Sequence, residues 1–291
     1  MQTEGDSIIT TRPVQNASTE THNSPARYAI ELRSVTKRFR TPTGQAYTAI
    51  RDLSLSVAPG EFCAIVGPTG CGKSTTLGLI SGLERPSSGE ALVMGKPVQG
   101  IDPGIGYVFQ SDAVFPWKNV LSNVATGPRF RGQSRDEANR KARDWIMRVG
   151  LAGFESHFPH QLSGGMRKRV ALAQTFISEP HILLMDEPFS ALDVQTRTLM
   201  EDELLNLWSS TSASVVFVTH DLEEAISLAD RVCVITSGPG TVKGIYTIDL
   251  PRPRNLADIR FEPRFVELYQ QIWEDLRNEV MISYERNKQR I

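Results

Sequence analysis

The chain has 291 residues, of which 40% are apolar, and its 32 Lys and Arg nearly balance 33 Asp and Glu, giving a net charge of −1. These values are typical of a globular protein with its own core, and the balanced charge argues against nucleic acid as the main partner. Three cysteines, an odd number without metal-ligand spacing, exclude a disulfide framework and favour a reducing compartment. The apolar runs are far shorter than the roughly 20 residues of a membrane span, and the polar first residues lack the pattern of a secretion signal.

Two kinds of pattern predict the strands. Residues 1–27 are polar and without periodicity, which predicts a disordered extension, and order is expected to begin at Tyr28. Residues 28–33 and 53–57 alternate apolar and polar side chains, as half-buried antiparallel strands do. Continuous apolar runs suit strands buried on both faces of a parallel sheet, and they occur at 62–66, 182–185, 215–219 and 232–235. Runs of this kind separated by helical patterns predict an α/β sheet.

Helical patterns occupy two further regions. Between about residues 112 and 162 they predict an insertion between strands of the sheet, in which Ser134 to Glu137 has capping-box spacing and Gly150 ends a helix. Trp145 and Trp208 fall within helical patterns and are expected in the core. After Pro263, apolar residues at helical spacing predict an amphipathic helix that packs against the chain's own core: Phe265, Leu268, Ile272, Leu276 and Val280.

The segment from Gly67 to Ser74 matches the pattern G-x-x-x-x-G-K-[ST] between a buried run and a helical stretch. Its glycines let backbone N–H groups face an anion, Lys73 would reach the β- and γ-phosphates of a nucleotide, and the Ser74 hydroxyl would coordinate Mg²⁺. Cys71 is either a small residue tolerated in the loop or a thiol whose pKa the helix start lowers. The pattern alone fits a small-molecule kinase, a GTPase or a motor equally well. The expected nucleotide-binding residues are Gly67, Pro68, Thr69, Gly70, Cys71, Gly72, Lys73, Ser74 and Thr75.

Two adjacent acids follow the apolar run at 182–185. Because side chains alternate along a strand, Asp186 and Glu187 are expected to diverge. Asp186 would then hold Mg²⁺, and Glu187 would orient or deprotonate an attacking water. After a phosphate loop, these roles are favoured over the alternative that the two acids are helix caps or solvated loop charges.

A second glycine loop, Leu162 to Met166, precedes another helical stretch. Together with the phosphate loop, the Asp186-Glu187 pair, Ser190-Ala-Leu-Asp193 and Thr219-His220-Asp221, it resembles the ATP-binding cassette (ABC) ATPases over roughly residues 28–245. The resemblance implies an α/β fold: a P-loop NTPase (RecA-like) core with an antiparallel β subdomain and an inserted α-helical subdomain. It also implies that the chain is an ATP hydrolase that uses Mg²⁺. The tail, residues 246–291, follows the ATPase region and contains the predicted amphipathic helix.

The resemblance further implies that two copies of the chain pack head to tail. The loop Ser163, Gly164 and Gly165 of one copy would close over ATP held by the phosphate loop of the other. Met166 stands where most of the family has Gln, which leaves the contacts of Ser163 and the glycines intact.

Other positions take their roles from the same resemblance. Gln110 would sense Mg²⁺ and the attacking water, and His220 would contact the γ-phosphate. Asp193 would couple the two sites of the dimer. Phe39 would stack on adenine, with Tyr47 as a possible substitute and core packing as the alternative for Phe39.

The segment from Val108 to Trp117 and the tail from Asp249 to Arg254 resemble the branch that serves nitrate, sulfonate and taurine importers. This implies a peripheral ATPase on the cytoplasmic face of the inner membrane, with a separate integral-membrane permease bound around Gln110 to Trp117 and, indirectly, a solute-binding protein. An exporter or lipid-trafficking ATPase is an alternative because its site chemistry is identical. A soluble ATPase acting on ribosomes or DNA would usually carry two cassettes or a long coiled coil, and the sequence has neither pattern. The transported solute contacts other proteins and cannot be read from this chain.

Overall fold

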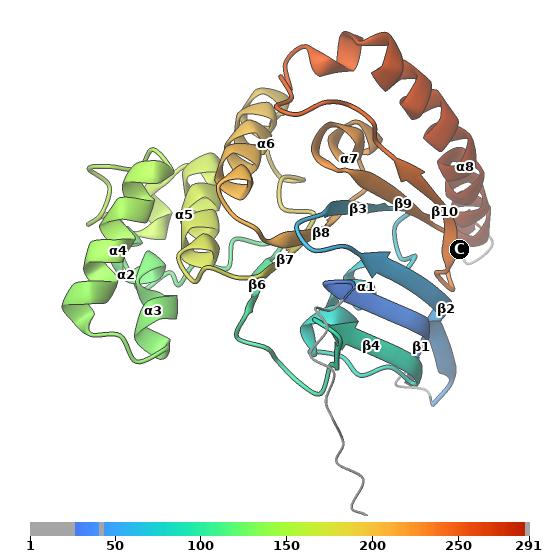
Figure 1. Ribbon diagram of the computed structural model, residues 1–291, viewed down its shortest axis with the longest axis horizontal. Helices are drawn as coiled ribbons and strands as arrows, with labels where there is room; N and C mark the ends of the chain where they lie inside the picture. Colours follow the sequence, from blue (N-terminus) through green and yellow to red (C-terminus); the bar gives the residue numbers. More distant parts are fainter. Residues whose placement is uncertain (1–26, 41–43, 289–291) are drawn as a thin grey trace, which may run out of the picture.

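The computed structural model describes residues 27–40 and 44–288, which form two sheets, a group of helices beside them and a long C-terminal helix (Figure 1). The predicted disorder of residues 1–27 concerns a segment that, apart from Arg27, lies outside these ranges. Within them, every helix is too short or too polar to cross a membrane.

An antiparallel sheet carries the first strands in the order β2-β1-β4-β5. Alternate side chains such as Ile30, Leu32, Leu53 and Leu55 are buried, as their pattern predicts. The strands are longer than predicted because irregularities in the β1–β2 register interrupt the alternation. The strands are β1 (Ile30–Arg40), β2 (Ala46–Val57), β4 (Ser88–Val93) and β5 (Lys96–Pro97).

A second, mostly parallel sheet has six strands in the order β10-β9-β3-β8-β7-β6. The prediction found β3, β7, β8 and β9, but it missed the two edge strands, which are partly exposed and lack a continuous apolar run. β10 is antiparallel to β9, and the expected end of the ATPase region at residue 245 falls inside it. The strands are β3 (Phe62–Val66), β6 (Ile105–Val108), β7 (Ile182–Asp186), β8 (Ser214–Thr219), β9 (Arg231–Ile235) and β10 (Val242–Thr247).

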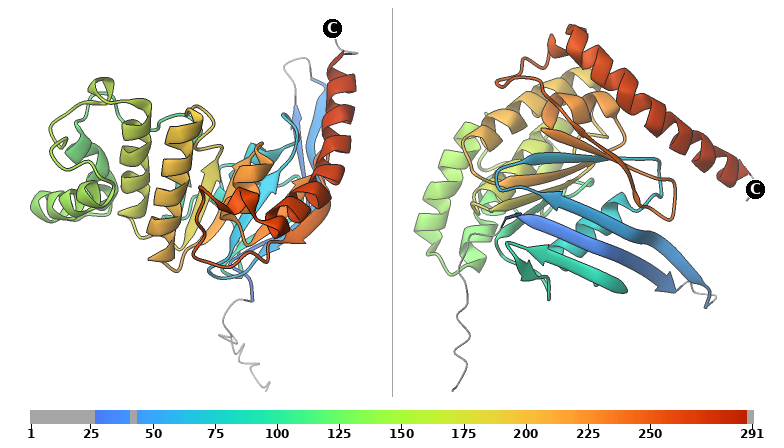
Figure 2. Two further views of the ribbon diagram at one scale, coloured as in Figure 1. Left: turned by 90° about the horizontal axis from the view of Figure 1, so that it is seen from above. Right: turned by 45° about the vertical axis from the view of Figure 1, so that its right-hand side comes forward.

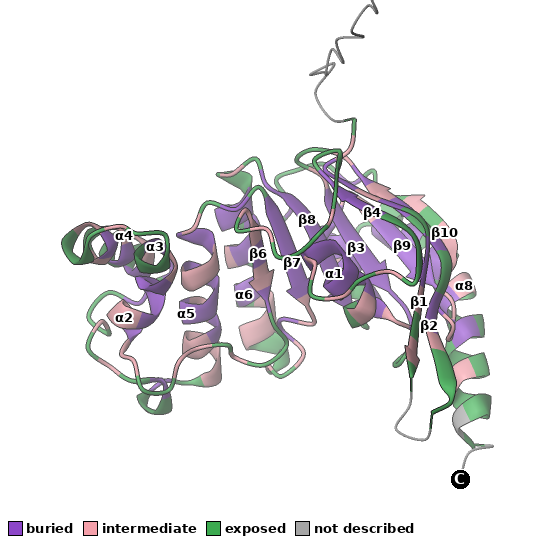
Figure 3. Cartoon of the chain, turned by 90° about the horizontal axis from the view of Figure 1, so that it is seen from below, coloured by how far each residue is buried: buried purple, intermediate pink, exposed green. Residues whose placement is uncertain are grey.

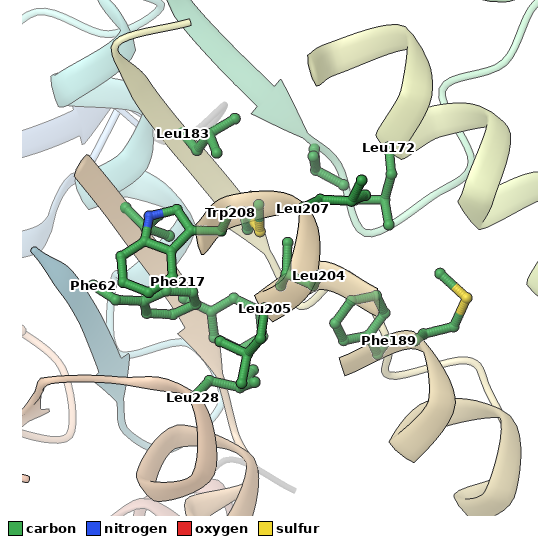
Figure 4. Packing of buried hydrophobic residues seen from close by; sticks show 14 of the residues in the cluster. Phe62, Leu172, Leu183, Phe189, Leu204, Leu205, Leu207, Trp208, Phe217 and Leu228 are labelled. Atoms are coloured by element: carbon green, nitrogen blue, oxygen red, sulfur yellow. The ribbon is translucent and has the colours of Figure 1, made fainter. Parts of the chain in front are cut away.

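The four central strands of this sheet, β9, β3, β8 and β7, are buried on both faces (Figure 3). Along β3, Cys63 and Ile65 pack with α1 and the antiparallel sheet, while Phe62 packs with the helices of the opposite face. Figure 4 shows Phe62 beside Trp208 and Phe217, with ring centroids 5.3 and 5.8 Å from its own. The prediction that Trp208 belongs to the core is therefore confirmed. The covering helices are α1 (Lys73–Ser81), α6 (Val194–Ser209) and α7 (Leu222–Leu228).

The helical insertion forms a group at one end of the molecule, at the opposite end from the C-terminal helix (Figure 2). Ser134 caps its longest helix by accepting a 3.3 Å hydrogen bond from the Glu137 N–H. Trp145 is partly buried, with its ring 5.8 Å from that of Phe176. The insertion contains α2 (Val120–Val124), α3 (Thr126–Phe130), α4 (Arg135–Arg148) and the 3₁₀ turn η1 (Pro159–Gln161), and α5 (Gly164–Phe176) follows it in the same group.

Arg254 attaches the tail to the end of α7. Its buried Nη1 donates hydrogen bonds of 3.2, 2.9 and 2.8 Å to the carbonyls of Ile226, Ser227 and Ala229. These carbonyls have no partner within their own helix, so a cation there also offsets the negative end of the helix dipole. The tail continues through η2 (Ile259–Phe261) to α8 (Pro263–Lys288).

The apolar face of α8 is largely as predicted. Phe265, Leu268, Ile272 and Leu276 are buried, but Val280 is 39% exposed, so the prediction for that residue is wrong. Near this end of α8 the buried side chain is that of Glu279.

Candidate active site

The phosphate loop, residues 67–74, connects β3 to α1 and packs closely against β2. Gly70 and Gly72 have φ angles of 79° and 101°, a left-handed conformation that favours glycine. A Cβ on Gly72 would lie 2.9 Å from Ile50 Cγ1 and 3.0 Å from the Ala49 carbonyl oxygen. Cys71 is buried, and burial raises the pKa of its thiol, so the alternative of a lowered pKa is wrong.

Lys73 places a cation inside this loop. Its side chain is 6% exposed, and its Nζ donates to the carbonyls of Gly67 and Pro68 at 2.8 and 3.2 Å. The same Nζ lies 3.9 Å from Glu187 Oε1. Phosphate oxygens held by the loop would therefore meet a buried ammonium group as well as backbone N–H donors.

Asp186, the last residue of β7, faces the first turn of α1. Its Oδ1 accepts a 3.1 Å hydrogen bond from Ser74 Oγ. Burial raises the pKa of Asp186, although the bond from Ser74 opposes this shift. A cation beside the carboxylate would favour its charged form, and paired oxygens of this kind are ligands that Mg²⁺ prefers. The donor set thus fits the predicted metal.

Glu187 turns away from the strand. Its φ is 43°, in the left-handed region, and its N–H donates to the Val218 carbonyl at 2.9 Å. Glu187 Oε2 lies 3.0 Å from Nδ1 of His220, which follows β8. Asp186 and Glu187 do contact different partners. The two side chains are separated by a backbone turn at Glu187, and not by the expected alternation of side chains along a strand.

One pocket of about 560 Å³ gathers most of the predicted nucleotide-binding residues. Phe39 and Tyr47 are opposite one another in the β1–β2 register, and both aromatic side chains contribute to the wall. Gly67, Pro68 and Cys71 lie outside the lining, and Asp186 is linked to it through Ser74. The lining residues are Phe39, Tyr47, Ala49, Thr69, Gly70, Gly72, Lys73, Ser74, Thr75, Gln110, Glu187 and His220.

The remaining predicted site residues lie elsewhere. Ser163 caps α5 by accepting a hydrogen bond from the Met166 N–H at 3.2 Å, and Asp193 caps α6 by accepting one from the Thr196 N–H at 3.0 Å. A Cβ on Gly165 would lie 3.0 Å from Thr196 Cγ2, and one on Gly164 3.8 Å from Leu192, so the two helix starts are in contact. The structure therefore brings Ser163, Gly164, Gly165 and Asp193 together with one another, and not with the pocket.

Gln110 is held from α5 by residues that the sequence analysis missed. Lys168 is buried and donates to the Gln110 carbonyl at 2.8 Å, and its Nζ lies 3.3 Å from Asp112. Arg167 also pairs with Asp112, at 2.8 Å. The sequence shows Asp112 close after Gln110, and Arg167 and Lys168 close after the Ser163 loop. Only the fold shows that this acid and these cations are in contact. The helix that begins at Ser163 is thus tied to a loop that lines the pocket.

A second missed group lies behind His220. The Thr219 hydroxyl donates to buried Glu224, and Asp221 caps α7 and pairs with Arg197 of α6 at 3.1 Å. Arg197 also donates to the Leu192 carbonyl at 3.3 Å, beside Asp193. Burial raises the pKa of Glu224 to about 8, although the hydrogen bond from Thr219 opposes this, and burial raises that of Glu201 to about 7.

Similarity to known proteins agrees with this geometry. The family described as ABC transporter matches residues 50–190. An ABC transporter ATP-binding protein of Methanocaldococcus jannaschii is 43% identical over 254 residues, which are 87% of this chain and 93% of that protein. A taurine import ATP-binding protein of Burkholderia thailandensis is 42% identical over 238 residues, 80% of this chain and 92% of the relative. A dimeric ATP-binding cassette solved with ADP and Pi in a post-hydrolysis state superposes with a TM-score of 0.68 at 30% identity, over 76% of this chain and all of that one.

The chain belongs to the ABC transporter ATP-binding protein family. It has the predicted P-loop NTPase fold and is an ATP hydrolase.

Proposed function

We propose that this chain is the ATP-hydrolysing subunit of an importer of the nitrate, sulfonate and taurine type. It would act as a peripheral protein at the cytoplasmic face of the inner membrane and energise uptake through a separate permease, which in turn receives its solute from a binding protein. The similarity to a taurine import ATP-binding protein over 92% of that relative supports this branch.

The observation that carries the proposal is an apolar hollow of about 470 Å³ between β6, α3 and α5. Phe109, Phe115 and Phe130 line it, and Phe130 is 81% exposed. Exposed aromatic side chains around a hollow suit an amphipathic helix of a partner protein. Phe109 precedes Gln110, which lines the nucleotide pocket, so a permease helix seated here would contact the segment that meets ATP.

Within the pocket we assign roles to the polar groups. Lys73 and the loop N–H groups would bind the β- and γ-phosphates, His220 would contact the γ-phosphate, and Glu187 would orient the attacking water. Ser74, Asp186 and Gln110 would hold Mg²⁺, which when bound neutralises charge on the phosphates. Phe39 would stack on adenine.

The second half of the active centre would come from another copy of the chain. Ser163, Gly164 and Gly165 would close over ATP bound by the partner copy, and Asp193 would couple the two sites. Two observations support this arrangement: these residues lie outside the pocket of their own chain, and the similar solved cassette is a dimer. We assign ATP binding and hydrolysis to residues 28–245, with about 112–162 as the inserted helices and 246–291 as the tail.

Reconstitution with the permease tests the transport role. Phe130→Glu should prevent co-purification with the permease while basal ATP hydrolysis of the isolated chain is kept, because a charge enters the apolar hollow. Phe261→Glu, at a 77% exposed aromatic on η2 in the tail, is the matched control and should bind normally. Proteoliposomes containing the complex and the binding protein should then take up labelled taurine, sulfonate or nitrate with ATP. Co-purification with ribosomal subunits, or ATP-driven efflux, would contradict the proposal.

A further inference from the structure

The loop between β9 and β10, residues 236–241, lies directly against the phosphate loop. The Gly240 N–H donates to the Ala49 carbonyl at 2.8 Å, and the Gly240 carbonyl accepts from the Arg51 N–H at 2.9 Å. A Cβ on Gly240 would lie only 2.0 Å from the Cys71 carbonyl oxygen. The 236–241 loop therefore packs against both β2 and the phosphate loop, with no space between Gly240 and Cys71.

Two side chains near the end of α8 hold the other side of this loop. Glu279 Oε2 accepts a 2.8 Å hydrogen bond from the Ser237 N–H. Arg286 Nη1 donates to the carbonyls of Ser237, at 3.2 Å, and Gly238. An acid and a cation of one helix thus bind the N–H and the carbonyls of the same short segment.

The Glu279 carboxylate is fully engaged in this contact. It is 6% exposed, and its Oε1 also pairs with Lys243 Nζ of β10 at 2.9 Å. Burial alone would raise the pKa of Glu279, but the bonds from Ser237 and Lys243 outweigh it and the pKa is lowered. A buried carboxylate is stable only when its oxygens are paired, so Glu279 fixes the relative positions of α8, the 236–241 loop and β10.

This end of α8 also reaches the wall of the nucleotide pocket. Ser283 and Arg286 line a hollow of about 380 Å³ that is also lined by Tyr47, Thr69 and Gly70. Those last three residues also line the nucleotide pocket itself. In contrast, Glu187 and His220 follow β7 and β8 and contact each other, apart from the hydrogen bonds by which α8 holds the 236–241 loop.

We propose that Glu279 and Arg286 are positioning residues that hold the 236–241 loop, and through it Thr69 to Cys71 of the phosphate loop, in the shape that binds ATP. The inference extends the ATP hydrolase activity and does not depend on the transported solute. Since the groups that face the attacking water are set by other strands, loss of these contacts weakens ATP binding and leaves the chemical step intact.

Steady-state ATP hydrolysis by the purified full chain tests this. Arg286→Ala and Glu279→Gln should each raise KM for Mg-ATP about 3- to 10-fold, with kcat within about 2-fold of the parent. Arg286→Lys, which still donates to carbonyls, should recover part of the lost affinity. Arg277→Ala removes an exposed arginine of the same helix and is the matched control, with KM unchanged.

Two results would overturn the proposal: a KM for Arg286→Ala equal to that of Arg277→Ala, or a fall in kcat at constant KM. Arg286 is exposed, so its removal leaves the core in place and this variant decides the question even if Glu279→Gln fails to fold. The parent protein in the same assay reports ATP hydrolysis itself, so failure of the positioning role is distinguished from failure of the activity.

Discussion

The phosphate-loop side and the Ser163 side of the active centre are both built at helix starts, yet their polar groups are partnered differently. On the first side, the buried Lys73 cation of α1, the Glu187 carboxylate after β7 and the His220 imidazole after β8 line one pocket of about 560 Å³, and Asp186 reaches it through Ser74. On the second, Ser163 and Asp193 accept hydrogen bonds from the first turns of their own helices and line no part of that pocket. One side gathers groups able to bind a phosphate chain, whereas the residues of the other side lie outside that pocket.

This difference is what a site divided between two copies requires. The phosphate-loop side would bind ATP in one chain, and the loop of Ser163, Gly164 and Gly165 that closes over this ATP would come from the partner copy. The polar links from Lys168 to Gln110, and from Arg197 to Asp221 and Leu192, connect the two sides within one copy. Each copy would therefore transmit the state of its own pocket to the loop that it offers to the other.

The largest effect on the rate of ATP hydrolysis is expected from removing the Glu187 carboxylate on the phosphate-loop side. Glu187→Gln should lower kcat at least ~100-fold, the usual worth of a general base, and leave ATP binding in place because Lys73 and the loop are intact. Equilibrium binding of radiolabelled ATP and a hydrolysis assay on the same preparation measure both quantities. Turnover at the parent rate would remove Glu187 from this role.

Breaking each side in a different copy sharpens the comparison. Ser163→Trp and Lys73→Ala should each abolish hydrolysis, the first by blocking closure and the second by removing the phosphate cation. In a mixed dimer one site keeps both Lys73 and Ser163, so equimolar mixing with random exchange should restore about a quarter of the parent rate. Mixing Ser163→Trp with itself is the control. A monomer in which Ser163→Trp hydrolyses ATP at the full rate would refute the divided site.

The buried acid behind His220 predicts a dependence of stability on pH. Glu224 has an ordinary pKa of 4.5 and a folded value of about 8, so the folded state binds its proton more tightly than the unfolded state. Its contribution is complete below pH 4.5 and is lost as the pH rises towards 8. Glu201, Asp221 and Arg197 face Glu224 and shape this titration.

Denaturant titrations of Glu224→Gln measure this effect. Between pH 5 and 8, the free energy of unfolding of the parent should fall by about 2–4 kcal/mol more than that of Glu224→Gln. Glu223→Gln, at the exposed neighbouring position, should follow the parent. Parallel curves for the parent and Glu224→Gln would show that Glu224 is charged throughout.

The smallest effect is expected from a substitution of Met166, which stands where most of the family has Gln. Met166 is partly buried against the core, and its backbone N–H, not its side chain, bonds to Ser163. We expect Met166→Gln to change kcat by less than about 2-fold, because the bond to Ser163 does not use the Met166 side chain. Hydrolysis at saturating ATP measures this, and a rise of tenfold or more would assign the longer amide a part in closure.

The sequence predicted whatever depends on local pattern. The buried strands, the Ser134 cap and the phosphate loop follow from short-range spacing, and the structure places them as expected. Edge strands β6 and β10 escaped because partial exposure removes the continuous apolar run. The contact of Lys168 with Gln110 joins residues far apart in the chain, which local pattern does not predict. The burial of Glu224 beside Thr219 has no signal in the periodicity of the sequence. The left-handed turn at Glu187 occurs at a residue that is not glycine, so the sequence does not indicate it.

The three thiols give the chain a practical property. Cys63, Cys71 and Cys233 are all buried, and burial raises the pKa of each, that of Cys233 to about 12. At neutral pH maleimide and methanethiosulfonate reagents should therefore find almost no native thiolate. A single cysteine introduced on the surface, for instance at exposed Met147 of α4, can carry a fluorophore or spin label without first deleting the native three. Distance measurements between labelled copies can then follow how far the helical group moves during turnover.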